Sequence, residues 1–298
     1  MGNAVEVKNL TKSYGNMKAV NNVSFSFEPN KIYGLLGRNG AGKTTIMHMI
    51  TAQLFATSGE VKVFGEIPYE NNQALSKICF IKESQKYPPN FTVQDVLNIS
   101  SELFPNWDQS YAELLINDFQ LPLSRRIKRL SRGMLSSVGI IIGLASRSPL
   151  TIFDEPYLGL DAVSRTLFYN RLIEDYAEHP RTIVLSTHLI DEVSKILEHV
   201  IVIEKGELII NEDADMLRGR AFTVTGLANK VDTFISGKTV INHTPLGGFH
   251  SAIIMGSLGM DDRKQAESLG LEITPVSLQQ LIIYLTNGNS QGRAVGYE

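Results

Sequence analysis

Residues 37–45 read Gly-Arg-Asn-Gly-Ala-Gly-Lys-Thr-Thr and match the pattern G-x-x-x-x-G-K-[ST] of a phosphate-binding loop. The glycines permit backbone torsions that a Cβ would block, so several N–H groups can turn towards phosphate oxygens. We expect Lys43 to reach the β- and γ-phosphates of a nucleoside triphosphate and the Thr44 hydroxyl to bind Mg²⁺. The alternative interpretation is an incidental glycine-rich turn. The predicted nucleotide-binding residues here are Gly37, Arg38, Asn39, Gly40, Ala41, Gly42, Lys43, Thr44 and Thr45.

The segments on either side of this loop favour the phosphate-binding interpretation. Residues 32–36 form a short apolar run that predicts a buried strand, and residues 45–54 continue as an apolar-rich helix. The N-terminus of that helix would direct its positive end at the same anion.

Two adjacent carboxylates follow a second apolar run, residues 150–153. Asp154 at the end of this predicted strand would hold Mg²⁺ through water, the role of a Walker B aspartate. Glu155 comes one step later, where a carboxylate can face the γ-phosphate and polarise a water molecule. The alternative for this pair is a charge pair that stabilises a helix N-terminus.

The composition is that of an ordinary globular protein with room for one large and one small domain. The chain has 298 residues, 43% of them apolar and 20% charged, and its net charge of -3 gives no basic footprint. We therefore expect no nucleic acid as a partner. A single cysteine, Cys79, excludes an internal disulfide framework and fits a reducing compartment.

The N-terminal residues lack the basic and apolar regions of a signal peptide, and no stretch approaches the roughly 18 apolar residues that a membrane helix needs. We expect the protein to be soluble by itself and to reach a membrane only through a partner.

The pattern of strands and helices predicts an α/β fold with two parts. Strand and helix signals alternate as in a parallel sheet, interrupted by a mostly helical block at about residues 85–148 that opens with Thr92 as an N-cap and Asp95 three residues later. Residues 218–287 show the order β-α-β-β-α-β of a ferredoxin-like α+β domain, followed by a last helix. Residues 288–298 are rich in Gly, Ser and Asn and predict a flexible tail.

Several further motifs appear in a family order. Residues 130–134, Leu-Ser-Arg-Gly-Met, resemble the Leu-Ser-Gly-Gly-Gln signature of ATP-binding cassette (ABC) ATPases, and Leu158–Asp161 and Ser186–His188 resemble the D-loop and the switch histidine. The resemblance covers most of residues 5–215. It implies a P-loop NTPase core sheet with an inserted helical subdomain, an ABC ATPase domain over residues 1–217, and ATP and Mg²⁺ as ligands.

The resemblance also assigns roles to single residues. Tyr14 is placed to stack on adenine, as an aromatic face can, and Ala19 and Asp161 are placed beside the nucleotide. Glu155 and His188 are the implied catalytic residues, with His188 contacting the γ-phosphate. The alternative for an isolated histidine is a structural role.

In this family each nucleotide is held between the P-loop of one chain and the signature of a second chain, so Ser131, Arg132 and Gly133 would act in trans. The partner would be a second ABC ATPase chain, identical or different. Arg132 replaces a glycine of the signature. It could add a cation at the partner's γ-phosphate, but the solvent-facing alternative is favoured.

A second departure lies at the position of the family's Q-loop glutamine, which holds Glu83. Its carboxylate could still ligate Mg²⁺, so the predicted metal ligands are Thr44, Glu83 and Asp154, with Gln85 as a possible substitute for the glutamine. The following residues 87–89, Tyr-Pro-Pro, would offer a stiff exposed surface where the family docks a transmembrane permease.

Residues 104–108, Phe-Pro-Asn-Trp-Asp, resemble a segment of bacterial ABC ATPases similar to those of bacitracin and phenol-soluble-modulin exporters. We therefore expect an ATP-hydrolysing subunit at the cytoplasmic face of the cell membrane that powers export of a peptide, antibiotic or other amphipathic compound. The rival readings are a soluble ABC-type ATPase and a degenerate sensory cassette. The basic run at residues 125–129 has two readings, an anion-attracting surface or, preferred, a solvated helix end.

Overall fold

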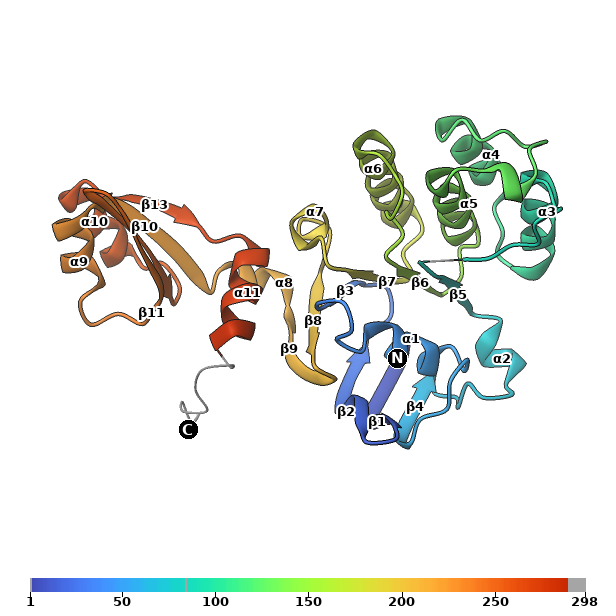
Figure 1. Ribbon diagram of the computed structural model, residues 1–298, viewed down its shortest axis with the longest axis horizontal. Coiled ribbons are helices and arrows are strands. Elements are labelled where there is room, and N and C mark those ends of the chain that lie inside the picture. Colours follow the sequence, from blue (N-terminus) through green and yellow to red (C-terminus); the bar gives the residue numbers. More distant parts are fainter. Residues whose placement is uncertain (1, 84, 289–298) are drawn as a thin grey trace. The chain divides into compact units, whose positions relative to one another are not determined.

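A computed structural model describes residues 2–83 and 85–288 (Figure 1). The described residues form two compact units: one holds the residues up to His188 together with Ile196–Asn211, and the other holds Leu189–Lys195 together with the described residues from Glu212 onward. The second unit therefore begins a few residues before the predicted boundary at 218, and it also includes the segment directly after His188. Of the predicted flexible tail, only Gly288, the last residue of a helix, lies within the described residues.

The first unit is built on a six-stranded sheet in the order β5-β6-β7-β3-β8-β9. The β5–β6, β6–β7, β7–β3 and β3–β8 pairs are parallel, as the alternation of strands and helices predicted. The carboxyl ends of β3, β6 and β7 therefore meet at one edge. The strands are β3 (Ile32–Leu36), β5 (Ile78–Ile81), β6 (Leu150–Asp154), β7 (Thr182–Thr187), β8 (His199–Glu204) and β9 (Glu207–Asp213).

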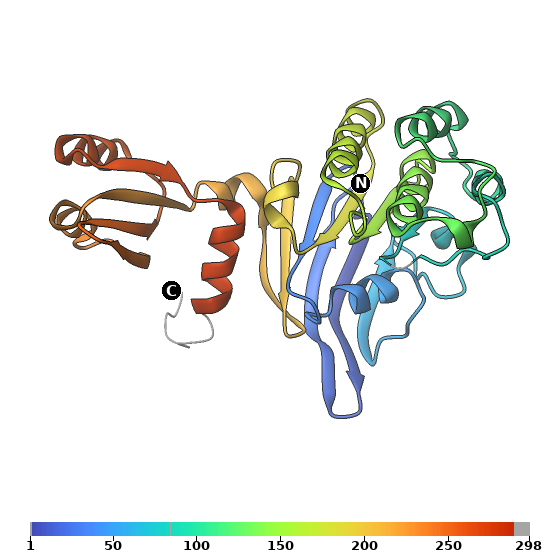
Figure 2. The same ribbon diagram turned by 45° about the horizontal axis from the view of Figure 1, so that its top comes forward.

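The N-terminal strands form a separate antiparallel sheet in the order β2-β1-β4. β1 (Val5–Tyr14) turns into β2 (Met17–Phe27) through two residues, and such a short connection can join only antiparallel neighbours (Figure 2). β4 (Ser58–Val63) pairs with the other side of β1. Helix α1 (Lys43–Ile50) packs into a core that both sheets share, with Ile46, Met47, Met49 and Ile50 fully buried.

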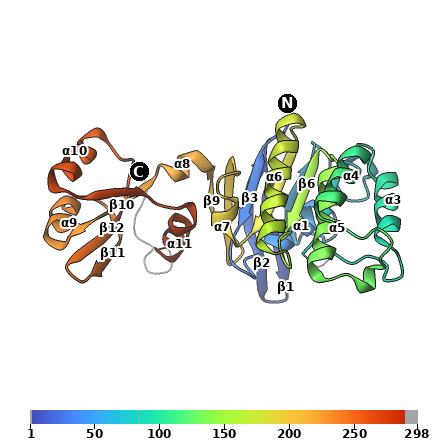
Figure 3. The same cartoon turned by 90° about the horizontal axis from the view of Figure 1, so that it is seen from above.

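The predicted helical block lies beside the β5 edge of the central sheet (Figures 1 and 3). It contains α3 (Val93–Leu103), α4 (Gln109–Asp118) and α5 (Arg132–Ala145), with the short α2 (Asn72–Leu75) ahead of β5. A capping box opens α3, since Thr92 and Asp95 each accept the other's backbone N–H, at 3.2 and 2.8 Å. α5 then packs on both β5 and β6.

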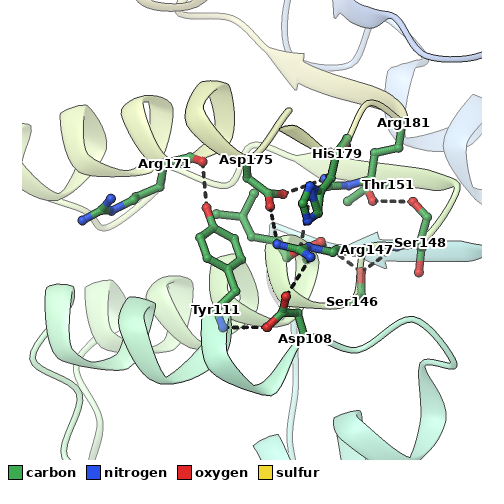
Figure 4. Close-up of polar contacts among 12 residues, drawn as sticks. Asp108, Tyr111, Ser146, Arg147, Ser148, Thr151, Arg171, Asp175, His179 and Arg181 are labelled. Carbon is green, nitrogen blue, oxygen red and sulfur yellow. Dashed lines mark hydrogen bonds and ion pairs between the residues drawn. The ribbon is translucent and has the colours of Figure 1, made fainter. Parts of the chain in front are cut away.

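A buried ion network joins this block to the central sheet (Figure 4). Asp175 of α6 (Ala162–Glu178) pairs with Arg181 at 2.6 Å and with Arg147 at 3.0 Å, and Arg147 also pairs with Asp108 at 2.7 Å. Asp108 in turn caps α4 by accepting the N–H of Tyr111. The segment 104–108 thus acts as a helix cap and an anchor for the block.

The second unit contains a four-stranded sheet in the order β11-β12-β10-β13, whose neighbours are all antiparallel. Its elements follow as β10 (Ala221–Leu227), α9 (Ala228–Ile235), β11 (Val240–Leu246), β12 (Phe249–Met255), α10 (Met260–Leu269) and β13 (Glu272–Pro275). This is the predicted ferredoxin-like arrangement, and α9 and α10 share one apolar core with the sheet (Figure 3).

The remaining helices of the second unit lie against each other. α11 (Leu278–Gly288) contacts α7 (Ile190–Val193) and α8 (Ala214–Arg218). The segment that follows His188 is therefore packed under the last helix of the chain. Within the part of the chain that the structure describes, no helix is both long and apolar enough to cross a bilayer.

The ion network predicts that two adjacent carboxylates of α6 contribute very differently to the free energy of unfolding. The Asp175 side chain is 2% exposed and faces two arginines, whereas Glu174 is 60% exposed and, among the described residues, its one ion pair is with Arg171. Asp175→Ala should lower the free energy of unfolding by about 3–5 kcal/mol, because it leaves buried Arg181 without its counter-charge. Glu174→Ala, the matched control, should cost at most about 1 kcal/mol. Urea unfolding measures both, and equal costs would contradict this account.

Candidate functional site

A cleft of about 500 Å³ opens where β3, β6 and β1 approach the start of α1. It brings together most of the predicted nucleotide-binding and metal residues from five separate segments of the chain. The residues that line it are Tyr14, Met17, Ala19, Asn39, Gly40, Ala41, Gly42, Lys43, Thr44, Thr45, Glu83, Asp154 and Glu155. A second hollow shares part of the loop with this cleft and is lined by Arg38, Asn39, Gly40, Ala41, His188, Glu204 and Lys205.

The glycine at position 42 is required by the path of the loop. Gly42 precedes α1 with φ at 111°, and a Cβ there would lie 2.5 Å from the carbonyl oxygen of Ala19. Ala19 therefore shapes the loop through its backbone as well as lining the cleft. The first residues of α1 line the cleft, where the N-terminus of the helix would stabilise an anion.

Lys43 lies beneath the loop with its side chain 6% exposed. Its Nζ donates to the carbonyl oxygens of Gly37, at 2.7 Å, and Arg38, at 3.3 Å, and lies 3.8 Å from Glu155 Oε1. Burial lowers the pKa of Lys43, and the negative charges of Glu155 and Asp154 oppose this shift. The Lys43 ammonium is thus positioned by two backbone carbonyl groups, which phosphate oxygens could replace as its hydrogen-bond acceptors.

Thr44 and Asp154 form the part of the site suited to a hard cation. The Thr44 hydroxyl donates to Asp154 Oδ2 at 2.9 Å, linking the first turn of α1 to the end of β6. Hydroxyl and carboxylate oxygens are the ligands that Mg²⁺ uses in nucleotide sites. These two residues therefore fit a Mg²⁺ ion.

Glu155 occupies a strained and enclosed position directly after β6. Its φ of 50° lies in the left-handed region, which costs a non-glycine residue about 1–2 kcal/mol. The backbone N–H donates to the Ser186 carbonyl at 3.0 Å, and the side chain is 7% exposed. Burial raises the pKa of the Glu155 carboxyl, while contacts with His188 and Lys43 oppose the rise.

His188 and Tyr157 complete the surroundings of this carboxylate. His188 Nδ1 lies 3.0 Å from each carboxylate oxygen of Glu155 and 3.0 Å from the Tyr157 hydroxyl. The Tyr157 hydroxyl also donates to Glu155 and accepts from Thr187. One hydroxyl thus ties the end of β6 to the end of β7.

Tyr157 was not among the residues predicted from the sequence. No motif marks it, and the only signal was its position two residues after Glu155, beyond a proline. Its hydroxyl contacts Glu155, directly after β6, and Thr187 at the end of β7, and the residue is only 3% exposed.

The residues predicted to act in trans lie outside this cleft, at the start of α5. Ser131 caps α5 by accepting the N–H of Met134 at 3.2 Å. A Cβ on Gly133 would lie 2.5 Å from the Gly159 carbonyl oxygen, so the signature and the D-loop need glycine where they touch. Asp161, predicted beside the nucleotide, caps α6 by accepting the N–H of Ser164 at 2.7 Å.

Arg132 and Glu83, the two residues that depart from the family pattern, lie close to each other. Arg132 Nη2 lies 3.6 Å from Glu83 Oε1, with the side chains 66% and 46% exposed. Such an exposed pair contributes at most about 1 kcal/mol, so it can be exchanged for other contacts. In the next segment Pro88 and Pro89 are exposed as expected, but the hydroxyl of Tyr87 is buried, so the tyrosine does not belong to that surface.

Comparison with known proteins agrees with this geometry. The family described as ABC transporter matches residues 20–158. A bacitracin transport ATP-binding protein of Enterococcus faecalis is 34% identical over 224 residues, which cover 74% of this chain and 73% of the relative. The chain belongs to the ABC transporter ATP-binding family. It is accordingly an ATP-binding subunit and an ATPase, as its motifs predicted.

One further relative agrees with this assignment, and one solved structure shares the fold. A lantibiotic transport ATP-binding protein of Streptococcus pyogenes is 30% identical over 212 residues, which cover 71% of this chain and 91% of the relative. A solved dimeric ATP-binding cassette in a post-hydrolysis state, bound to ADP and Pi, shares the fold with a TM-score of 0.62 and 23% identity, covering 70% of this chain and 98% of that one.

Removing the Tyr157 hydroxyl should slow hydrolysis without weakening ATP binding. Tyr157→Phe loses hydrogen bonds to a charged group, which contribute roughly 1.5–3 kcal/mol, so kcat should fall about ten- to a hundredfold if they position Glu155. Steady-state kinetics should show the loss in kcat with KM for ATP nearly unchanged.

The matched control is Tyr87→Phe. Its hydroxyl is also buried but has no hydrogen-bond partner in the described part of the chain, so kcat should change little. Equal kcat values for the two variants, or a Tyr157→Phe effect confined to KM, would contradict a positioning role.

Proposed function

We propose that this ABC ATPase powers export of a peptide, antibiotic or other amphipathic compound through a separate membrane permease. The observation that supports ATP hydrolysis as its source of energy is the enclosed carboxylate of Glu155, held 3.8 Å from Lys43 and 3.0 Å from His188. Transport of such a compound is supported by the names of the two relatives, which refer to bacitracin transport and lantibiotic transport. The outward direction rests on the resemblance of residues 104–108 to a segment of exporter ATPases.

We infer that the phosphates of ATP lie along residues 39–45, with Lys43 leaving the Gly37 and Arg38 carbonyls to contact the β- and γ-phosphates. Tyr14 is 49% exposed at the rim of the cleft, which leaves ring surface available for stacking on adenine. Ala19, which follows Tyr14 and precedes the P-loop in the sequence, lines the same cleft.

Thr44 and Asp154 would hold Mg²⁺, and Glu83 lines the same cleft as a third oxygen donor. When bound, Mg²⁺ would neutralise charge on the β- and γ-phosphate oxygens. Glu83 must leave its ion pair with Arg132 to approach the cation. Because exposed ion pairs are weak, this exchange costs little free energy.

Hydrolysis would follow from the position of Glu155. Its ionised carboxylate accepts a proton from a water molecule as that water attacks the γ-phosphorus in line with the leaving oxygen. Lys43 and His188 stabilise the charge that develops on the phosphoryl oxygens. The Tyr157 hydroxyl holds the Glu155 carboxylate and the His188 imidazole in position relative to each other. The products are ADP and phosphate.

A second chain would complete each site. Ser131 and Gly133 lie at the N-terminus of α5, which can present a hydroxyl, a backbone N–H and a helix dipole to a γ-phosphate held by another chain. Arg132, 66% exposed beside them, would add a positive charge there. ATP would then join two chains, identical or different, and hydrolysis would separate them.

Trapping experiments test the paired-site mechanism. Glu155→Gln should retain ATP and form a stable ATP-bound dimer while kcat falls at least about a hundredfold, since it lacks the general base. Lys43→Ala, the control, should bind ATP weakly and stay in the apo oligomeric state. Size-exclusion chromatography with ATP and a phosphate-release assay measure these outcomes; unchanged turnover in Glu155→Gln would remove this residue from the base role.

Association with a permease can be tested in membranes of the native organism. If the chain is a transporter subunit at the cytoplasmic face of the membrane, detergent extraction should recover it with a polytopic membrane protein. Substituting exposed Pro88 and Pro89 by Ser should weaken that association and leave basal ATPase activity nearly unchanged. Recovery of the chain without any membrane protein would instead favour the alternative, a soluble ABC-type ATPase.

A further inference from the structure

Three potential metal ligands from different elements of the second unit converge on one point. They are Asp232 of α9, His243 of β11 and His250 of β12. His250 Nδ1 lies 3.0 Å from Asp232 Oδ1 and 3.1 Å from His243 Nε2, and His243 Nε2 lies 3.5 Å from Asp232 Oδ1. Two imidazoles and a carboxylate are ligands that Zn²⁺ and related cations prefer.

The spacing of these atoms fits a tetrahedral cation. Ligands at about 2.0–2.1 Å from zinc lie about 3.3 Å from each other along the edges of a tetrahedron. The three observed separations are 3.0, 3.1 and 3.5 Å. The planes of the two imidazole rings stand at 85° to each other, so the rings are not stacked face to face.

Hydrogen bonding alone accounts poorly for this convergence. A histidine ring nitrogen carries either one N–H or one lone pair, directed in the plane of the ring. His250 Nδ1 nevertheless has two partners at nearly equal distance, Asp232 and His243. A cation at the common point would satisfy all three atoms through one lone pair each.

The elements that carry the ligands are rigidly placed. His243 pairs with Ala252 across the β11–β12 hairpin, so His243 and His250 are diagonal neighbours on one face, and the register is set by a Gly247-Gly248 turn. Ala252 on that face is buried in the core beneath α9. Asp232 is next to buried Val231 of α9, which anchors its helix on the same face.

The site is accessible to a cation from solvent. The side chains of Asp232, His243 and His250 are 52%, 37% and 19% exposed. A structural zinc site would use a fourth protein ligand, whereas three ligands with this exposure leave a position for water. We propose that Asp232, His243 and His250 form a binding site for a divalent transition-metal cation, with Zn²⁺ as the best-fitting ion. All three ligands belong to the second unit, whereas the P-loop and Glu155 belong to the first.

The proposal is tested by titrating Zn²⁺ into the tag-free full chain, without ATP because nucleotides bind zinc themselves. Calorimetry should show one equivalent bound, and Co²⁺ in place of Zn²⁺ should give the visible absorption of a tetrahedral or five-coordinate complex. His243→Ala and Asp232→Asn should each lower the zinc affinity at least about tenfold, since even indirect partners of metal ligands change affinity about 10- to 100-fold.

His199→Ala is the matched control, because His199 is a histidine of the first unit that bonds Asn211. It should leave zinc affinity unchanged, and the conservative Asp232→Asn keeps the test valid if an alanine variant folds poorly. The proposal is overturned if the wild-type chain binds no zinc, which would identify a hydrogen-bonded surface triad, or if His243→Ala and Asp232→Asn bind zinc as tightly as the wild type.

Discussion

Two opposite charges buried at the carboxyl ends of parallel strands impose the main constraint on the first unit. Lys43 and Glu155 are each less than a tenth exposed, and charges removed from water need partners that replace its hydrogen bonds. The loop carbonyls satisfy Lys43, while His188 and Tyr157 satisfy Glu155. These partners come from β3, β6 and β7, so the site exists only where the parallel sheet brings three strand ends together.

This constraint explains why the site is rigid on one side and open on the other. The P-loop, Asp154 and Glu155 are fixed by backbone contacts that leave little space, such as the approach of Gly42 to Ala19. Arg132 and Glu83, in contrast, are exposed and joined by a weak ion pair. The rigid residues can hold the fixed geometry that chemistry needs, while the exposed residues can exchange one partner for another.

The helical block and the second unit are stabilised by different kinds of interaction. The helical block is tied to the sheet through Asp175 and its two arginines, and loss of one partner would leave a buried charge uncompensated. The second unit has its own apolar core, and it includes the short helix α7 directly after His188. A single peptide bond therefore separates His188, which contacts Glu155, from a segment that packs with α11.

The sequence alone determined the chemistry of the P-loop, because Gly42, Lys43 and Thr44 are contiguous and their spacing leaves few alternative functions. It also determined the α/β core with its helical insertion and the ferredoxin-like order, since strand and helix periodicities are local properties of the chain. The capping box at Thr92 was likewise readable, because it involves only residues three apart.

Contacts between distant segments could be decided only by the tertiary structure. Tyr157 reaches His188 across 31 residues, and Arg132 reaches Glu83, yet neither pair has a sequence pattern because strand order and loop paths create them. The same holds for Asp232, His243 and His250, which a hairpin register and an overlying helix bring within 3.5 Å. Local spacing predicts which residues can react, whereas the folded backbone decides which of them meet.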